Sequence, residues 1–105
     1  MHGSIQARRE EVAALCRRFG VVRLDVFGSA ARGDDFDPER SDADLLVTFA
    51  ADREPGLADF LDFKSSLEAL LGRRVDLVER PAVERSRNAI RRRNILNEAQ
   101  PLYAA

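Results

Sequence analysis

Apolar residues recur along this chain in two periods, one typical of helices and one typical of strands. A three-to-four spacing predicts helices over residues 4–19 and 57–71, and Gly20 and Gly72 stand where these helices should end. Pro81 is well placed to open a third helix. Inward positions of the first helix are predicted at Ile5, Val12, Leu15, Cys16 and Phe19, with Ser4 as its cap. In the second they are predicted at Leu57, Phe60, Leu61, Lys64, Leu67, Leu70 and Leu71, and in the third at Val83, Ile90 and Leu96.

Alternating and continuous apolar runs predict the strands. Residues 22–27 alternate and indicate a half-buried strand, whereas residues 42–49 become apolar on both faces and indicate a central strand. A short strand is predicted at 75–78, and Pro101 confines a strand at 101–103 to a sheet edge. The acidic stretch 33–41 has no apolar period and is predicted to be a loop. This order of elements favours an α/β (α+β) fold, a small mixed sheet packed with helices.

Length, charge and cysteine content narrow the class of protein. With 105 residues, the chain is expected to be a single domain over 1–105. Its 17 basic and 18 acidic residues nearly cancel, so no bulk attraction to nucleic acid or membrane is expected. Cys16 is the only cysteine, which excludes an internal disulfide and a cysteine zinc site. The sequence has neither a membrane-spanning apolar run nor a signal peptide, so a cytoplasmic location is expected.

Carboxylates are the candidate catalytic groups. Asp42 and Asp44 are two residues apart on a predicted strand, and such side chains share one face, about 6.5–7 Å apart. Asp76 lies between apolar residues on the next strand, where a lone buried acid is costly unless it is paired or ligated. Pairing with Arg74 is the structural alternative for Asp76. Shared Mg²⁺ would relieve the repulsion among these acids, and two ions would suit in-line displacement at phosphorus, with Asp76 accepting the proton of the nucleophile.

A small-residue turn precedes these acids. Gly28 and Ser29 follow a strand and begin a short predicted helix, a placement suited to binding phosphate. Arg32 is predicted either to neutralise triphosphate charge or to have a structural role, in which it interacts with Asp34 or Asp42. A Gly-Ser turn alone is weak support, and the Ser-Asp-x-Asp strand that follows makes the nucleotide interpretation the stronger one.

These two motifs together resemble the minimal nucleotidyltransferases (MNT) of the DNA polymerase beta superfamily. The similarity covers Gly28-Ser-x-Ala-Arg-Gly33, Ser41-Asp-x-Asp-Leu-Leu-Val47, Arg73-Arg-Val-Asp-Leu-Val78 and the terminal Ile95–Tyr103. The resemblance implies a polymerase-beta-like fold, ATP with Mg²⁺, and transfer of a nucleoside monophosphate to a hydroxyl. It implies nucleotide binding by Gly28 and Ser29, and metal binding and catalysis by Asp42, Asp44 and Asp76. Because stand-alone domains of this size in the family are typically antitoxins, the resemblance also implies that this domain adenylylates a tyrosine on a HEPN-domain ribonuclease toxin.

Three other interpretations are weighed against this one. The first is a catalytically idle module that masks its partner, and the second is an antibiotic nucleotidyltransferase, which the lack of room for an acceptor domain disfavours. The third is nucleic-acid binding through an arginine cluster near the C-terminus. Those arginines wrap around a helix rather than forming one stripe, which favours a solvated face or a partner contact. They are Arg85, Arg87, Arg91, Arg92 and Arg93. The C-terminal Tyr103 is predicted to be an edge or docking residue rather than the acceptor.

Overall fold

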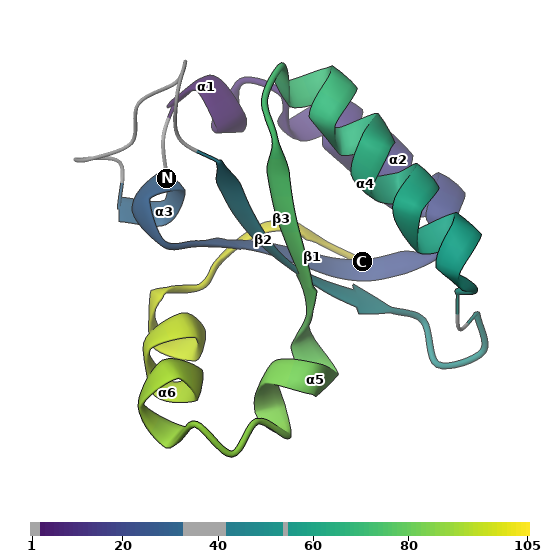
Figure 1. Ribbon diagram of the computed structural model, residues 1–105. Coiled ribbons are helices and arrows are strands. Elements are labelled where there is room, and N and C mark those ends of the chain that lie inside the picture. Colours follow the sequence, from purple (N-terminus) through teal and green to yellow (C-terminus); the bar gives the residue numbers. More distant parts are fainter. Residues whose placement is uncertain (1–2, 33–41, 54) are drawn as a thin grey trace.

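A four-stranded mixed sheet lies at the centre of the molecule (Figure 1). The computed structural model describes residues 3–32, 42–53 and 55–105. The strand order is β3-β2-β1-β4, with β1 antiparallel to both neighbours and β2 parallel to β3. The strands are β1 (Val21–Phe27), β2 (Ala43–Phe49), β3 (Val75–Glu79) and β4 (Gln100–Ala104). The mixed sheet, the central position of β2 and the edge position of the C-terminal strand are thus confirmed.

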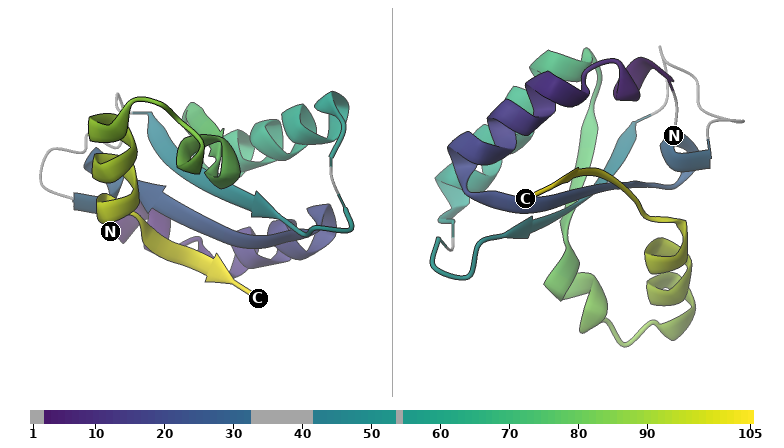
Figure 2. Two further views of the ribbon diagram at one scale, coloured as in Figure 1. Left: turned by 90° about the horizontal axis from the view of Figure 1, so that it is seen from below. Right: turned by 180° about the vertical axis from the view of Figure 1, so that it is seen from behind.

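Helices cover both faces of this sheet, as the views in Figures 1 and 2 show. The long helices α2 and α4 pack against each other on one face, and α5 and α6 lie on the other. The bounds are α1 (Gly3–Gln6), α2 (Arg9–Phe19), α3 (Ser29–Arg32), α4 (Leu57–Leu71), α5 (Arg80–Glu84) and α6 (Ala89–Glu98). None of the helices in the described part of the chain is long and apolar enough to cross a membrane.

The larger hydrophobic core lies between the sheet and the α2–α4 pair. Fully buried side chains of α2, the sheet and α4 meet there, among them Val12, Leu24, Leu45 and Phe63. Tyr103 packs against this core from β4. Burial of this apolar surface, at about 25 cal/mol per Å², is the main force holding α2 and α4 on the sheet.

A smaller core lies on the opposite face, under α5 and α6. Phe27, Leu46, Val83 and Ile95 are its buried members. Because Ala43, Leu45 and Val47 of β2 point into the larger core, the alternate residues Asp44 and Leu46 point toward α5 and α6. One face of the sheet therefore carries the larger core, whereas the other carries the smaller core together with the side chain of Asp44.

A buried ion-pair cluster ties α5 to this second face. The carboxylate of Asp25 is completely buried in β1. Arg23 donates from Nε to both of its oxygens at 3.0 Å, and Arg80 donates from Nη1 to Oδ2 at 3.0 Å. Arg80 also lies 3.7 Å from Glu84 along α5. Because Arg80 begins α5, this Asp25 cluster fixes where the helix starts on the sheet.

The first predicted helix is split, and the first predicted strand is more buried than expected. Instead of one helix over 4–19, α1 and α2 are separated by a turn at Ala7 and Arg8. Neither residue is glycine or proline, so the sequence carries no signal for the break. The prediction of a half-buried strand is wrong beyond Leu24, because α5 and α6 cover the second face of β1. The end of α2 at Gly20, in the left-handed conformation, is confirmed.

The predicted inward faces of the later helices also need correction. In α4 the buried residues are Phe63, Leu67 and Leu71, whereas Leu57 is 75% exposed. The third predicted helix is two helices, because Asn88 begins α6 by accepting a hydrogen bond from the Arg91 backbone N–H at 3.1 Å. This new start changes which side of α6 faces inward. Its buried residue is Ile95, whereas Ile90 is 75% exposed and Leu96 is half-buried.

Candidate active site

The Gly28 turn lies directly beside an acidic side chain. Gly28 follows the last residue of β1 and has a φ of +68°, and Ser29 then begins the single turn of α3. A Cβ atom at position 28 would lie 2.5 Å from Oδ2 of Asp44, closer than carbon and oxygen can approach. Glycine is therefore required here both for the left-handed backbone and for the space that the carboxylate occupies. The predicted strand–turn–helix around Gly28 and Ser29 is confirmed as geometry.

Two of the predicted acids are neighbours on adjacent strands. In the parallel pairing of β2 with β3, Asp44 stands opposite Asp76, and on its other side Asp44 stands opposite Phe27 of β1. Parallel partners project to the same face, and neighbouring strands lie about 4.8 Å apart. Asp44 and Asp76 are thus adjacent carboxylates on the α5–α6 face, with Gly28 completing the row.

The argument from burial at Asp76 is wrong. Its side chain is exposed, because β3 is an edge strand and Asp76 lies near the start of that strand. The alternative pairing of Asp76 with Arg74 is also not what the structure has. Nε of Arg74 instead lies 3.3 Å from Oδ1 of Asp42, just ahead of β2. This pair is largely solvent-exposed, so it holds Asp42 only weakly.

The three acids do not form a ready-made metal cage. Among the side chains that the structure describes, no group of three or more acidic, histidine or cysteine residues is arranged to hold a metal ion. Asp44 and Asp76 are paired by the strand register, whereas Asp42 is turned toward Arg74. A cation that used all three carboxylates would have to replace the Arg74 guanidinium at Asp42. The available ligands fit Mg²⁺, because they are hard carboxylate oxygens and a divalent cation would relieve the repulsion between neighbouring carboxylates.

Part of the predicted phosphate site cannot be placed. The side chain of Arg32, predicted to contact either phosphates or Asp34 and Asp42, lies outside the described residues, as does the predicted loop 33–41. The backbone of Arg32 ends α3. Gly28 and Ser29, the other members of the predicted nucleotide-binding set, lie where β1 is followed by α3.

A cleft of about 480 Å³ opens between this row and helix α6. Phe27, Gly28 and Asp44 line one side, and α6 supplies the other. The α6 residues, which we call the α6 wall, are Asn88, Ile90, Arg91, Asn94, Ile95 and Glu98. Four of them, at positions 91, 94, 95 and 98, follow the helical i, i+3, i+4, i+7 spacing, so they form one stripe toward the acids.

The α6 wall is the part of the site that the sequence analysis missed. The arginine cluster was interpreted as a solvated or partner-facing surface, and Arg85, Arg87 and Arg93 are indeed exposed. Arg91, however, lines the cleft, and Arg92 donates from Nη1 to the Ser86 carbonyl. The available signal was Asn88, whose capping preference would have set the start of α6 and therefore which arginine faces the acids.

This arrangement provides the parts that a phosphoryl-transfer site needs. A turn free of side chain at Gly28 leaves room for phosphate beside Asp44, and a second carboxylate stands on the adjacent strand. The cleft beside Gly28 and Asp44 is open to a ligand and is bounded by apolar and hydrogen-bonding side chains of α6. Nucleotide chemistry at a divalent cation is the reaction class that this combination favours.

Comparison with known proteins also indicates nucleotide chemistry. The family model described as "Nucleotidyltransferase domain" matches residues 9–102. "Protein adenylyltransferase MntA" of Thermococcus cleftensis is 46% identical over 70 residues, which cover 67% of each chain. A solved structure described as a minimal nucleotidyltransferase superposes with a TM-score of 0.73 at 44% identity, covering 96% of both chains.

A more distant structural neighbour shares the fold. It is the MNT antitoxin in complex with a tri-AMPylated HEPN toxin of Shewanella oneidensis, with a TM-score of 0.63 and 18% identity. The superposition covers 96% of this chain and 73% of that one.

Proposed function

The chain belongs to the nucleotidyltransferase domain family, and from that premise we propose that it is an antitoxin that transfers AMP from ATP to a tyrosine of a HEPN-type ribonuclease toxin. The observation that carries the proposal is the pairing of Asp44 with Asp76 beside the Gly28 turn. The Thermococcus cleftensis relative is named a protein adenylyltransferase, which supports a protein as the acceptor of the AMP group. The AMPylated toxin in the structural neighbour supports its class.

In this proposal Asp42, Asp44 and Asp76 would hold two Mg²⁺ ions, and Gly28, Ser29 and Arg32 would bind the nucleotide phosphates. When bound, Mg²⁺ offsets phosphate charge and lowers the pKa of an attacking hydroxyl. To serve as a ligand, Asp42 would have to give up its ion pair with Arg74, which would cost little because that pair is exposed. The missing Cβ at Gly28 lets phosphate approach Asp44 without a clash.

The chemical step forms one bond and breaks one. The tyrosine oxygen attacks the α-phosphorus of ATP, the bond between that phosphorus and the pyrophosphate oxygen breaks, and pyrophosphate leaves. In this proposal Asp76 accepts the tyrosine proton. The exposure of its side chain on the edge strand β3 supports that role, because a protein acceptor can reach it there. The product is AMP joined to the tyrosine oxygen through a phosphodiester.

The acceptor tyrosine comes from another protein. Tyr103 packs against the core on the α2–α4 side of the sheet, whereas Asp44 faces the opposite side. The sheet therefore stands between the Tyr103 ring and the acids.

Mass spectrometry of the toxin after incubation with this chain, ATP and Mg²⁺ tests the proposal. We expect one or more AMP units on tyrosine and loss of ribonuclease activity. Asp44→Asn should slow transfer at least about a hundredfold because it removes a metal ligand. Asp52→Asn, in the exposed turn after β2, is the matched control and should transfer at the wild-type rate. A toxin that is neutralised without modification, by wild type and Asp44→Asn alike, would instead establish masking by binding.

A further inference from the structure

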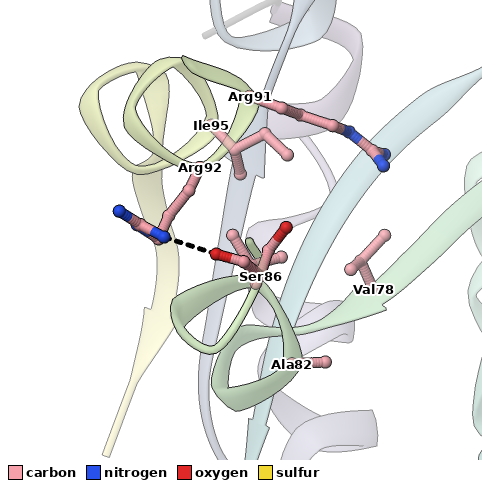
Figure 3. Close-up of a pocket in the computed structure, with 7 residues that line it drawn as sticks. Val78, Ala82, Ser86, Arg91, Arg92 and Ile95 are labelled. Atoms are coloured by element: carbon pink, nitrogen blue, oxygen red, sulfur yellow. Dashed lines mark hydrogen bonds between the residues drawn. The ribbon is translucent and has the colours of Figure 1, made fainter. Parts of the chain in front are cut away.

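A second hollow adjoins the active-site cleft. It has a volume of about 210 Å³, lies between α5 and α6, and is drawn in Figure 3. Its lining residues are Val78, Ala82, Val83, Ser86, Arg91, Arg92 and Ile95. Arg91 and Ile95 also line the cleft that contains Gly28 and Asp44. The two hollows therefore adjoin each other at Arg91 and Ile95 of α6.

The strand register places this α5–α6 pocket next to the paired acids Asp44 and Asp76. Val78 at its base is two residues after Asp76 on β3, so both side chains point to the same face, about 6.5–7 Å apart. The same relation holds on β2, where Leu46 follows Asp44 by two residues and is the register partner of Val78. A group joined through a sugar to a phosphate beside Asp44 and Asp76 is within reach of this pocket.

The shape and chemistry of the pocket suit a heteroaromatic ring. A cavity of about 150 Å³ can bind benzene, so a hollow of 210 Å³ has room for a flat base. Its inner walls are apolar, at Val78, Val83 and Ile95. The Ser86 hydroxyl accepts from the Asn88 backbone N–H at 3.2 Å. Because a hydroxyl has a proton of its own to donate, Ser86 can also bond to a ring nitrogen.

The two arginines at the rim have different roles. Figure 3 shows their side chains leaving α6 in different directions, with Arg92 turned to Ser86 and Arg91 extended over the sheet. Arg92 is thus held by the Ser86 carbonyl. Among the described residues, none forms an ion pair with the Arg91 guanidinium. A planar guanidinium at the boundary of the two hollows is suited to stacking on an aromatic ring.

We propose that the α5–α6 pocket binds the purine base of the nucleotide, with Arg91 stacking on the ring and Ala82 and Ser86 bounding it. This inference rests on the proposed function, since it places the base of the same ATP whose phosphates lie at Gly28. It assigns to Arg91 a nucleoside-binding role. The pocket gives the site a means of discriminating ATP from a ligand that has phosphates but no base.

Calorimetry with ATP and with inorganic tripolyphosphate, both with Mg²⁺, tests the pocket. Ala82→Leu fills the hollow from an exposed position of α5, and Arg91→Ala removes the stacking group. Each should weaken ATP binding about five- to thirtyfold while leaving tripolyphosphate binding unchanged. Ala89→Leu and Arg93→Ala are matched controls on exposed positions of α6 that line neither hollow, and should leave both affinities within about twofold.

The outcomes separate this inference from the proposed function. Unchanged ATP affinity in Ala82→Leu and Arg91→Ala, with a wild-type chain that binds ATP and modifies the toxin, overturns the base pocket alone. Equal loss of ATP and tripolyphosphate affinity in Arg91→Ala would make Arg91 a phosphate ligand and also overturn it. Intact ATP binding with lost transfer would assign the pocket to the acceptor protein. A wild-type chain that binds neither ligand contradicts the proposed function itself.

Discussion

Gly28 and Gly72 share nearly the same left-handed backbone, with φ of +68° and +67°, but differ in what surrounds them. A Cβ at Gly28 would displace the Asp44 carboxylate, whereas nothing lies within 4 Å of a Cβ at Gly72. Alanine at either position has to adopt a conformation that costs about 1–2 kcal/mol. The two glycines therefore allow backbone strain to be separated from damage to the site.

We expect Gly28→Ala and Gly72→Ala to lower the free energy of unfolding by similar amounts, about 1–2 kcal/mol each. Gly28→Ala should also reduce AMP transfer strongly, because Asp44 has to move from its place beside the turn. Urea denaturation and a transfer assay on both variants give the comparison. Equal activity in the two variants would show that the Gly28–Asp44 contact has no part in the reaction.

At the scale of single elements, the Asp25 cluster positions α5 and with it one side of the pocket. Asp25→Asn should lower the free energy of unfolding by about 2–4 kcal/mol, because a buried carboxylate with three charged hydrogen bonds is replaced by a neutral amide between two arginines. Denaturant unfolding measures this loss. Glu84→Gln, which alters an exposed contact to the same Arg80, should change stability by less than about 1 kcal/mol. Comparable small losses of unfolding free energy in both variants would mean that hydration of Arg23 and Arg80 compensates for the loss of the Asp25 carboxylate.

The strands and the motifs on them could be predicted from the sequence, because their signals are local. Alternation, glycine stops and the Gly-Ser and Asp-x-Asp spacings each depend on a few neighbouring residues. The side of a helix that faces inward depends on what it packs against, so Leu57 and Ile90 were wrongly placed inside. The ion pairs of Asp25 depend on residues distant in the chain, and the sequence pattern contains no signal for such contacts. The position of Arg91 depends on where α6 starts, and the capping preference of Asn88 is the local signal for that start.

At the scale of the whole molecule, the buried thiol of Cys16 links stability to alkaline pH. Burial in α2 raises the pKa of Cys16 from 9.0 to about 12, with the neighbouring charge of Arg17 acting in the opposite direction. The unfolded thiol therefore ionises at a pH where the folded thiol is still protonated. Its contribution to stability is complete below about pH 9 and is lost as the pH rises toward 12, by about 1.4 kcal/mol per pH unit.

Denaturation of wild type and Cys16→Ala between about pH 8 and about pH 10.5 checks this linkage. The variant should be less stable at pH 8 because it leaves a small cavity, and the difference between the two proteins should shrink as the pH rises. Other groups that titrate in this range affect both proteins equally. A difference that stays constant with pH would contradict the raised pKa.

The parallel pairing of β2 with β3 determines when the site comes into existence as the chain folds. Parallel neighbours cannot be joined by a tight turn, so the whole of α4 lies between Asp44 and Asp76 in the sequence. Synthesis on the ribosome produces Gly28 and Asp44 first, and their antiparallel strands can pair early. Asp76 joins them after α4 has crossed the sheet and β3 has docked, a long-range closure with a high entropic cost. A chain in which β3 has not yet docked therefore lacks the pairing of Asp44 with Asp76, so the proposed site is complete only in the complete fold.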